Sequence, residues 1–204
     1  MTRRPYGPDH YTRRAKQQSY PARSVFKLQD IDAKHRILRP GQVVLDLGCA
    51  PGSWMLYAAQ RTGPSGRVVG VDVHGVDAKL PAHAVHLRAD IFEVTVDALR
   101  EVSSRPYDVV LSDMAPHTSG DKFVDQQRSL RLVERALEIA LEVSRPGASF
   151  VGKVFHSGDI EGLRARARER YSQVTLARPQ ATRKQSSEIY LVCIGLCAGD
   201  TSGP

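Results

Sequence analysis

Five segments with the pattern of buried β-strands end beside a charged side chain. The segments "QVVLDLG", "GRVVGVDV", "AVHLRAD", "YDVVLSDM" and "ASFVGKVF" carry, in this order, Asp46, Asp72, Asp90, Asp113 and Lys153. Such near-continuous apolar runs predict strands that are buried on both faces of a parallel sheet. Ligands bind such open sheets at the carboxyl ends of the strands. The five charged residues are therefore predicted to surround one ligand pocket.

Lys153 is the least expected of these residues, because a lysine in an apolar strand is costly to bury unless it has a partner or a chemical task. Asp113, in "LSDMAP", directly follows a neighbouring strand and could be that partner. Burial could instead lower the pKa of Lys153 and let its neutral amine act as a base. Both interpretations stay open, and we favour the functional one.

The glycine-rich segment "DLGCAPGSW", Asp46–Trp54, follows the first of these strands. It lacks the G-x-G-x-x-G spacing of dinucleotide sites, which argues against a nicotinamide-dependent oxidoreductase. Gly48 and Gly52 let the backbone approach a ligand closely, and Ser53 is expected to cap the helix that follows. Asp72, at the end of the next strand, is suited to bind both hydroxyls of a ribose. The alternative is a plain turn with a helix cap.

Three further residues have a functional and a structural interpretation. Asp90 could accept a hydrogen bond from an adenine amino group, or it could cap a helix that begins near Glu93. Trp54 is the single tryptophan, and its structural role would be that of a core anchor. Glu188, at the start of the last strand-like segment "EIYLVCIGL", taken alone is an ordinary exposed acid.

The composition excludes several classes of protein. No segment approaches the roughly 20 apolar residues of a membrane span, and the basic N-terminus lacks the apolar run of a secretory signal. The seven histidines and three cysteines show no metal-ligand spacing, so no metal site is predicted. The odd cysteine count favours reduced thiols. We therefore expect a cytoplasmic protein without membrane contact.

The order of the predicted elements gives the fold class and the domain organisation. Strand-like runs alternate with helical segments such as residues 121–143, which predicts an α/β fold with helices on both faces of a mostly parallel sheet. The chain length suits one domain, expected over residues 21–197. Residues 1–20 are expected to form a basic, partly flexible arm, and residues 198–204 a flexible tail.

Two local patterns give sharper expectations. The segment "SVFKLQDIDAKHRIL", residues 24–38, predicts an amphipathic helix with Val25, Leu28, Ile31 and Leu38 facing the core. The tripeptide "RPG" occurs twice, and each copy is expected to end a helix and turn the chain into the next strand.

The net charge of +7 is concentrated at the two ends of the chain. Residues 1–40 contain ten Lys or Arg and three Asp or Glu, whereas residues 41–160 contain twelve against fifteen. The last 44 residues contain seven against four. Such basic ends fit a phosphate backbone as partner, and they fit solvated, solubilising faces equally well.

Taken together and in this order, these segments resemble the FtsJ/RrmJ family of S-adenosylmethionine-dependent RNA 2′-O-ribose methyltransferases. The resemblance extends from Tyr11 to Leu196 and rests on "YTRRAKQQSYPARSVFKLQDID", "VLDLGCAPGSW", "VVGVDV", "LSDMAPHTSG", "GKVF" and "SSEIYLV". The glycine loop alone would indicate only a class I methyltransferase. The departures are Cys49 and Ser53 in that loop, where Ala and Gly are usual, and Pro21, where a residue such as Arg is usual.

The resemblance implies a catalytic tetrad of Lys27, Asp113, Lys153 and Glu188. Lys153 is then the candidate base for a ribose hydroxyl, or, if it stays charged, it stabilises the developing alkoxide. Burial and a neighbouring Lys27 favour the neutral amine, whereas Asp113 favours the ammonium, so the direction stays open. Lys27 and Glu188 would orient the hydroxyl and the sugar.

The resemblance also implies S-adenosylmethionine as cofactor and RNA as substrate. The predicted cofactor contacts are Gly48, Gly52, Trp54, Asp72, Asp90 and Asp113. The predicted phosphate contacts, at the basic ends of the chain, are Arg13, Arg14, Lys16, Arg23, Arg183 and Lys184.

The expected protein is thus a Rossmann-like class I methyltransferase with a seven-stranded sheet whose last strand is antiparallel. Its expected activity is 2′-O-methylation of RNA, specifically of a uridine in large-subunit ribosomal RNA. A transfer RNA substrate is an alternative, and so is a non-catalytic ribosome-assembly factor that retains the cofactor pocket. The intact tetrad argues against the assembly factor. A monomer is expected, because no surplus apolar face is evident.

Overall fold

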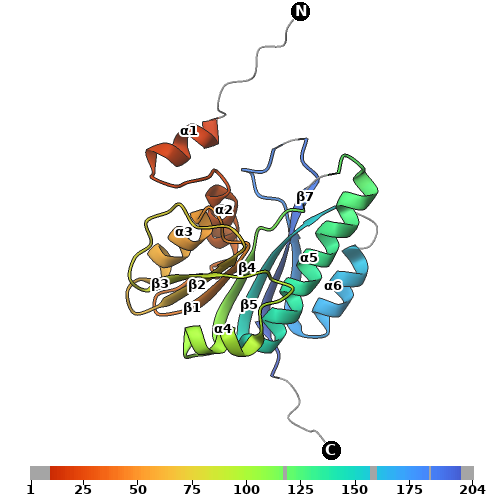
Figure 1. Cartoon of the computed structure of the whole chain (residues 1–204). Coiled ribbons are helices and arrows are strands. Elements are labelled where there is room, and N and C mark those ends of the chain that lie inside the picture. The colour runs from red at the N-terminus through yellow and green to blue at the C-terminus, as the bar shows by residue number, and fades with distance from the viewer. Residues whose placement is uncertain (1–9, 117–118, 157–159, 184, 199–204) are drawn as a thin grey trace, which may run out of the picture.

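The apolar segments form one seven-stranded sheet with the strand order β3-β2-β1-β4-β5-β7-β6 (Figure 1). The structure is a computed structural model. It describes residues 10–116, 119–156, 160–183 and 185–198. The strands are β1 (Val43–Leu47), β2 (Arg67–Asp72), β3 (Ala84–Arg88), β4 (Tyr107–Ser112), β5 (Ser144–Phe155), β6 (Tyr171–Ala177) and β7 (Glu188–Leu196). Strands β1 to β5 pair in parallel, and β7 lies antiparallel between β5 and β6. The predicted α/β fold with an antiparallel last strand is confirmed.

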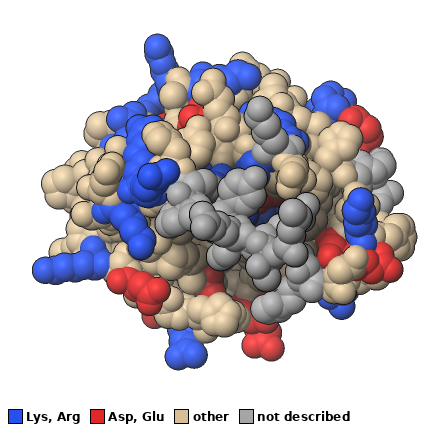
Figure 2. Space-filling model, turned by 90° about the horizontal axis from the view of Figure 1, so that it is seen from above, with Lys and Arg blue, Asp and Glu red and all other residues tan. Residues whose placement is uncertain are grey.

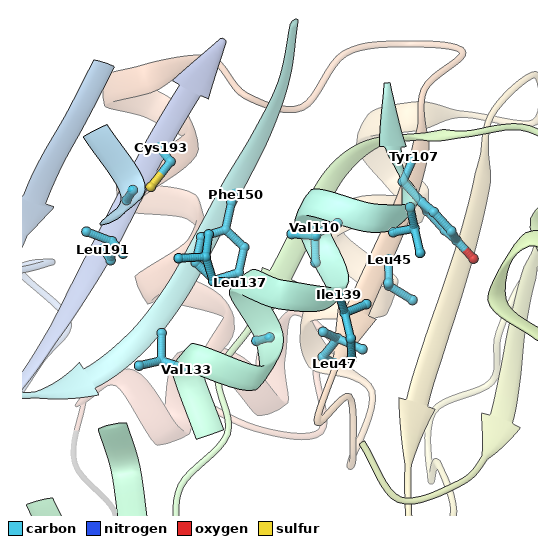
Figure 3. Close-up of a cluster of buried hydrophobic side chains, with 14 of the residues drawn as sticks. Leu45, Leu47, Tyr107, Val110, Val133, Leu137, Ile139, Phe150, Leu191 and Cys193 are labelled. Carbon is cyan, nitrogen blue, oxygen red and sulfur yellow. The ribbon is translucent and has the colours of Figure 1, made fainter. Parts of the chain in front are cut away.

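Helices cover both faces of the sheet, and each face has its own hydrophobic cluster. One face packs against α4 (Val96–Ser103), α5 (Lys122–Val143) and α6 (Ile160–Arg168), as Figure 3 shows for α5. The other face packs against α2 (Val25–His35) and α3 (Ser53–Thr62). Strand β1 serves both clusters, since Leu45 and Leu47 belong to the first and Val44 to the second. This alternation, with every residue of β1 buried, is what a sheet between two helical layers requires.

The helix predicted over residues 24–38 is shorter in the structure. It ends at His35, because Arg36 adopts the left-handed conformation (φ 52°) and its backbone N–H donates to the Asp32 carbonyl oxygen. Val25, Leu28 and Ile31 are buried as predicted. Leu38 is buried too, but it lies in the connection to β1 rather than on the helix.

The second "RPG" segment differs from its prediction. The first copy, residues 39–41, leads the chain into β1 as expected, but it does not end α2, which stops at His35. The second copy, residues 145–147, lies at the beginning of β5 itself instead of forming a separate turn before it. The pairing of β4 with β5 shifts register there, between Tyr107 and Val109, and Gly147 has a positive φ of 80°. Pro146 and Gly147 thus form an irregularity inside the strand, which is where a sheet tolerates these residue types.

Part of the predicted basic arm is helical. Helix α1 (His10–Gln17) buries Ala15 against Phe26 and Ala181 in a small third cluster. Residues 1–9 of the arm and 199–204 of the tail lie outside the described residues, so the predicted domain boundaries stay predictions. Among the helices that are described, none is long and apolar enough to cross a membrane.

Candidate active site

Four charged side chains meet at the carboxyl edge of the sheet, and we call Lys27, Asp113, Lys153 and Glu188 the tetrad. The Lys153 ammonium donates to the Asp113 carbonyl oxygen at 2.6 Å and lies 3.1 Å from Asp113 Oδ1. It is also 3.6 Å from Glu188 Oε1. The Lys27 ammonium donates to both carboxylate oxygens of Glu188, at 2.9 and 3.1 Å. Glu188 therefore connects the two lysines, and the four residues form one network.

The sheet register explains how residues so distant in sequence meet. Ser112 pairs with Gly152 in the parallel β4–β5 ladder, so Asp113 and Lys153 lie at neighbouring strand ends. In the antiparallel β5–β7 ladder, Glu188 pairs with Phe155, two residues from Lys153 and on the same face. Lys27 enters from the first turn of α2, which is packed on this face of the sheet.

Both lysines of the tetrad are buried, with exposed fractions of 8% for Lys27 and 5% for Lys153. A buried ammonium needs a negative partner, and each has one here. Burial by itself would raise the pKa of Glu188, but the charges of Lys27 and Lys153 outweigh it and lower the pKa below its ordinary value. Glu188 is therefore a carboxylate at neutral pH, held between two cations.

Two polar side chains complete the network and were missed in the sequence. The Tyr190 hydroxyl donates to Asp113 Oδ1 at 2.6 Å, and its ring lies 5.9 Å from the Lys27 ammonium. Burial, followed by the Asp113 charge, raises the pKa of Tyr190 well above its ordinary value, so it acts as a neutral donor. The Ser186 hydroxyl donates to Glu188 Oε2 at 3.0 Å. The alternation of β7 could have revealed Tyr190, which is two residues from Glu188 and so faces the same side.

A cavity of about 480 Å³ lies beside the tetrad, and we call it the glycine-loop cavity. Its lining includes Gly48, Asp72, Asp90 and Asp113, four of the six residues predicted to contact a cofactor. Asp72 is held in place by the backbone, because its carboxylate accepts from the N–H of Ala50 at 3.0 Å and of His74 at 2.8 Å. The cavity thus presents three carboxylate groups from three strand ends.

The two glycines of the loop, Gly48 and Gly52, cannot carry a side chain, because other parts of the protein already pack against them. Both have positive φ, 77° at Gly48 and 105° at Gly52. A Cβ at Gly48 would collide with Met114, which also lines the cavity, and a Cβ at Gly52 would collide with Val76 and Ala78. Gly52 itself is not part of the cavity lining.

Trp54 and Ser53 lie behind the cavity rather than in it. Trp54 is 3% exposed, its indole N–H donates to the Ser24 carbonyl oxygen, and its ring packs near Tyr190. This is the core-anchor role, and a cofactor contact of Trp54 stays a prediction. Ser53 was expected to cap α3, but Gly52 occupies the N-cap position and the Ser53 hydroxyl accepts from the Ala22 N–H instead.

Asp90 does not cap an α-helix. Its carboxylate accepts from the Phe92 N–H at 2.8 Å within a turn, and α4 begins later, at Val96, with Thr95 as its cap. The interpretation of Asp90 as the cap of a helix that begins near Glu93 is therefore wrong. Phe92 is half exposed and lines the glycine-loop cavity together with Asp90. An apolar ring beside a carboxylate is a suitable wall for a flat, hydrogen-bonding ligand group.

A second cavity, of about 430 Å³, lies on the other side of the tetrad and is called the Arg183 cavity. Its lining is Arg23, Lys27, Arg183, Gln185, Ser186 and Glu188. Arg23 donates to the Ala181 carbonyl oxygen at 2.6 Å, which joins the start of α2 to the segment that precedes β7. The tetrad therefore separates a cavity with acidic walls from one with basic walls.

The remaining basic residues of the N-terminal region are on α1. Arg13, Arg14 and Lys16 are exposed there. The Arg14 guanidinium lies 4.6 Å from the centre of the Phe26 ring, which holds it in place. Figure 2 views this end of the molecule and shows Lys and Arg side chains at several places around it. The predicted contact Lys184 lies outside the described residues.

Asp46 is the most deeply buried of the charged strand-end residues, at 1% exposed, and its carboxylate has no side-chain partner among the described residues. The backbone N–H of Met55 is the one group that acts to lower its pKa. Burial, and then the charges of Asp113 and Asp72, raise the pKa of Asp46 well above its ordinary value. Asp46 is therefore favoured in its neutral form.

The described residues contain no group of three or more side chains that could hold a metal ion.

Comparison with known proteins identifies the family. Residues 20–196 match the model of the FtsJ-like methyltransferases. The ribosomal RNA large subunit methyltransferase E of Desulfosudis oleivorans is 46% identical over 185 residues, 91% of this chain and 89% of that protein. The protein of the same name from Sorangium cellulosum is 48% identical over 196 residues, 96% and 92% of the two chains.

A solved structure supports the fold. The crystal structure of a ribosomal RNA methyltransferase from Plasmodium falciparum superimposes with a TM-score of 0.77 at 24% identity, covering 88% of this chain and all of that one. With the family model matching nearly the whole domain, the chain belongs to the FtsJ-like methyltransferase family.

Proposed function

We propose that this methyltransferase transfers a methyl group from S-adenosylmethionine to the 2′-hydroxyl of a uridine ribose in large-subunit ribosomal RNA. One observation carries the proposal: the tetrad lies between two cavities and lines both of them. Asp113 lines the glycine-loop cavity, and Lys27 and Glu188 line the Arg183 cavity. A group transferred from one ligand to another must pass such a boundary.

The glycine-loop cavity suits S-adenosylmethionine. Asp72 would bind the ribose hydroxyls, Asp90 the adenine amino group, and Asp113 the methionine end, with Phe92 against the flat ring. Gly48 is compatible with close approach of the ligand to the loop backbone. The cofactor supplies an electrophilic methyl group on a sulfonium, which needs no metal ion. We place Gly52 and Trp54 in the supporting structure of this loop.

The tetrad would act on the acceptor hydroxyl. A sugar hydroxyl is a poor nucleophile at neutral pH, so its proton needs an acceptor. We assign this role to Lys153, whose ammonium must first release a proton to solvent. The ammonium that forms again when the amine accepts the hydroxyl proton is stabilised by Asp113 at 2.6 and 3.1 Å and by Glu188 at 3.6 Å. Lys27 and Glu188 would orient the ribose, because both line the cavity on the acceptor side.

The Arg183 cavity would hold the acceptor nucleotide. Arg23 and Arg183 on its wall can bind phosphate oxygens, and the basic residues of α1, with Lys184, would extend this contact along the backbone. RNA is the substrate class because DNA has no 2′-hydroxyl. The relatives' names specify ribosomal RNA of the large subunit.

We also infer a cytoplasmic monomer, since ribosomal subunits are assembled in the bacterial cytoplasm. The large apolar side chains exposed among the described residues, Val73, Phe92 and Phe123, are few, and Phe92 borders the glycine-loop cavity. A monomer does not need to cover them.

The test is methyl transfer from labelled S-adenosylmethionine to large ribosomal subunits and to bulk transfer RNA. The variants are Lys153→Ala and, as a control that removes an exposed lysine, Lys79→Ala. We expect label on a ribose of the ribosomal RNA with wild type and Lys79→Ala, and none with Lys153→Ala. Label on transfer RNA would support the alternative substrate, and label on a base would contradict the mechanism. Tight cofactor binding without any transfer would favour an assembly factor.

A further inference from the structure

A third cavity, of about 460 Å³, lies at the opposite edge of the sheet from the tetrad, and we call it the Arg36 cavity. It is bordered by the connection from α2 to β1 and by α3, and its polar lining is Arg36, Arg39, Arg61, Asp32 and Tyr57. Strand β1 separates this edge from the glycine loop, a distance of roughly 16 Å at about 3.3 Å per residue. The cavity is therefore not part of the site described above.

One arginine of this cavity is fixed by a buried acid. Asp32 is 3% exposed, and its Oδ2 accepts from the Tyr57 hydroxyl at 2.8 Å and from Arg61 Nε at 3.0 Å. Its Oδ1 accepts from the Leu38 N–H at 2.9 Å. The Arg61 side chain is nevertheless 47% exposed. The buried Asp32 thus anchors the Arg61 guanidinium, and the rest of the Arg61 side chain is open to the solvent.

The other two arginines have no side-chain partner within the described part of the chain. Arg36 and Arg39 are exposed, and their side chains make no hydrogen bond or ion pair with any other described residue. Three guanidinium groups therefore surround one carboxylate, which is already saturated by its own partners. The cavity therefore has an excess of positive charge, and an anionic ligand would be attracted to it.

Basic residues near the C-terminus of a helix also stabilise the helix dipole, which is the structural explanation for such residues. That explanation fits Arg61, in the last turn of α3, and Arg36, next to the end of α2. It does not fit Arg39, which lies four residues beyond the end of α2 in a turn. A purely structural role therefore leaves Arg39 unexplained.

We propose that the Arg36 cavity binds a backbone phosphate of the RNA substrate, as a second contact remote from the methylated nucleotide. Planar guanidinium groups bind phosphate oxygens in pairs. A single phosphodiester carries one negative charge, as a carboxylate does, but an RNA backbone brings further phosphates beside it, and three guanidinium groups suit such a polyanion better than an isolated carboxylate. The inference rests on the proposed function in that the RNA is the methylation substrate. Because the two contacts are on opposite edges of the sheet, at least roughly 16 Å apart, an RNA of only two or three nucleotides around the methylated uridine does not reach both, whereas a large folded RNA does.

The test compares two substrates, the intact large ribosomal subunit and a short oligonucleotide that contains the methylated uridine. The variant is Arg36→Ala/Arg39→Ala, and the matched control is Arg100→Ala/Arg166→Ala, which removes two exposed arginines that pair with Asp97 and Glu134. For the subunit, we expect the KM of the variant to rise about tenfold with kcat unchanged, and the salt slope of binding to fall by about 2. For the oligonucleotide, KM stays within about twofold, and the control behaves as wild type.

Other outcomes overturn the inference. Equal KM values for variant and wild type on the subunit would contradict it, and so would a parallel rise in KM on both substrates. Binding of inorganic phosphate at Arg39, followed by NMR, without any change in the KM for the subunit would assign the cavity to a free anion. Arg39→Glu alone serves if the double variant unfolds, since its side chain has no partner to lose. If wild type methylates neither substrate, the proposed function fails, and binding of the same subunits still tests the cavity.

Discussion

Two carboxyl groups at the same edge of the sheet, one partly buried and one fully buried, have opposite environments. Glu188, at the start of β7, lies between two ammonium groups and a serine hydroxyl, and its pKa is lowered. Asp46, near the end of β1, has no side-chain partner among the described residues, two acids lie nearby, and its pKa is raised despite the backbone N–H of Met55. Burial acts in the same direction on both, so the partners decide the sign. The charged network of the tetrad is thus a specific construction and not a general property of this edge.

The strongest test of that view is the removal of a tetrad lysine. Lys153→Ala should lower the rate of methyl transfer by about 10³-fold or more, because it removes the proton acceptor and leaves Asp113 and Glu188 without its charge. Single-turnover transfer to large ribosomal subunits measures the rate. Binding of S-adenosylmethionine, measured by calorimetry, should change by less than about threefold. A variant that retains a tenth of the wild-type rate would exclude Lys153 as the proton acceptor.

The second test asks whether the Tyr190 hydroxyl positions Asp113. Tyr190→Phe removes one hydrogen bond to a charged acceptor, 2.6 Å long, and should lower kcat about tenfold with little change in KM. Tyr171→Phe is a matched control, because the Tyr171 hydroxyl is buried without any hydrogen-bond partner in the described structure. The control should keep full activity. Equal kcat values for the two variants would show that the Tyr190 hydroxyl does not contribute.

The sequence predicted those active-site residues that carry a local signal and missed, or found only by resemblance, those that meet across a long sequence separation. Lys153 is conspicuous because it interrupts an apolar strand, and parallel pairing then places it near Asp113. Glu188 and Lys27, 161 positions apart, carry no local signal of their meeting, and they were found only through the family resemblance. Tyr190 was missed because a tyrosine in an apolar strand is indistinguishable from a core residue. Ser53 was expected to cap a helix, but Gly52 occupies that N-cap position. For Asp90 the helix cap was one of two interpretations, and it is excluded because α4 begins only at Val96.

A third test uses stability in acid. Since the pKa of Glu188 is lowered in the folded protein, its charge stabilises the fold above the unfolded value of about 4.3 and the stabilisation is lost as the pH falls through the folded value. Glu188→Gln should unfold several degrees lower than wild type at pH 7, because the buried Lys27 ammonium loses its ion-pair partner and Lys153 keeps only Asp113. The difference should shrink below pH 4. Thermal unfolding followed by circular dichroism measures both, and a constant difference across this range would contradict the assignment.

The last test, on Asp46, should give the opposite sign. Its folded pKa is raised, so the stability it contributes is complete below the unfolded value of about 3.9 and declines as the pH rises. Asp46→Asn removes this decline. We expect the variant and wild type to unfold at similar temperatures near pH 4 and the variant to unfold about 3 °C higher at pH 7.5, which corresponds to roughly 1 kcal/mol for a chain of this size. A loss of stability in Asp46→Asn that grows with pH would mean that Asp46 is charged and has a partner. Asp46 and Glu188 would then both be charged and paired, and the charged network of the tetrad would no longer distinguish its own part of this edge.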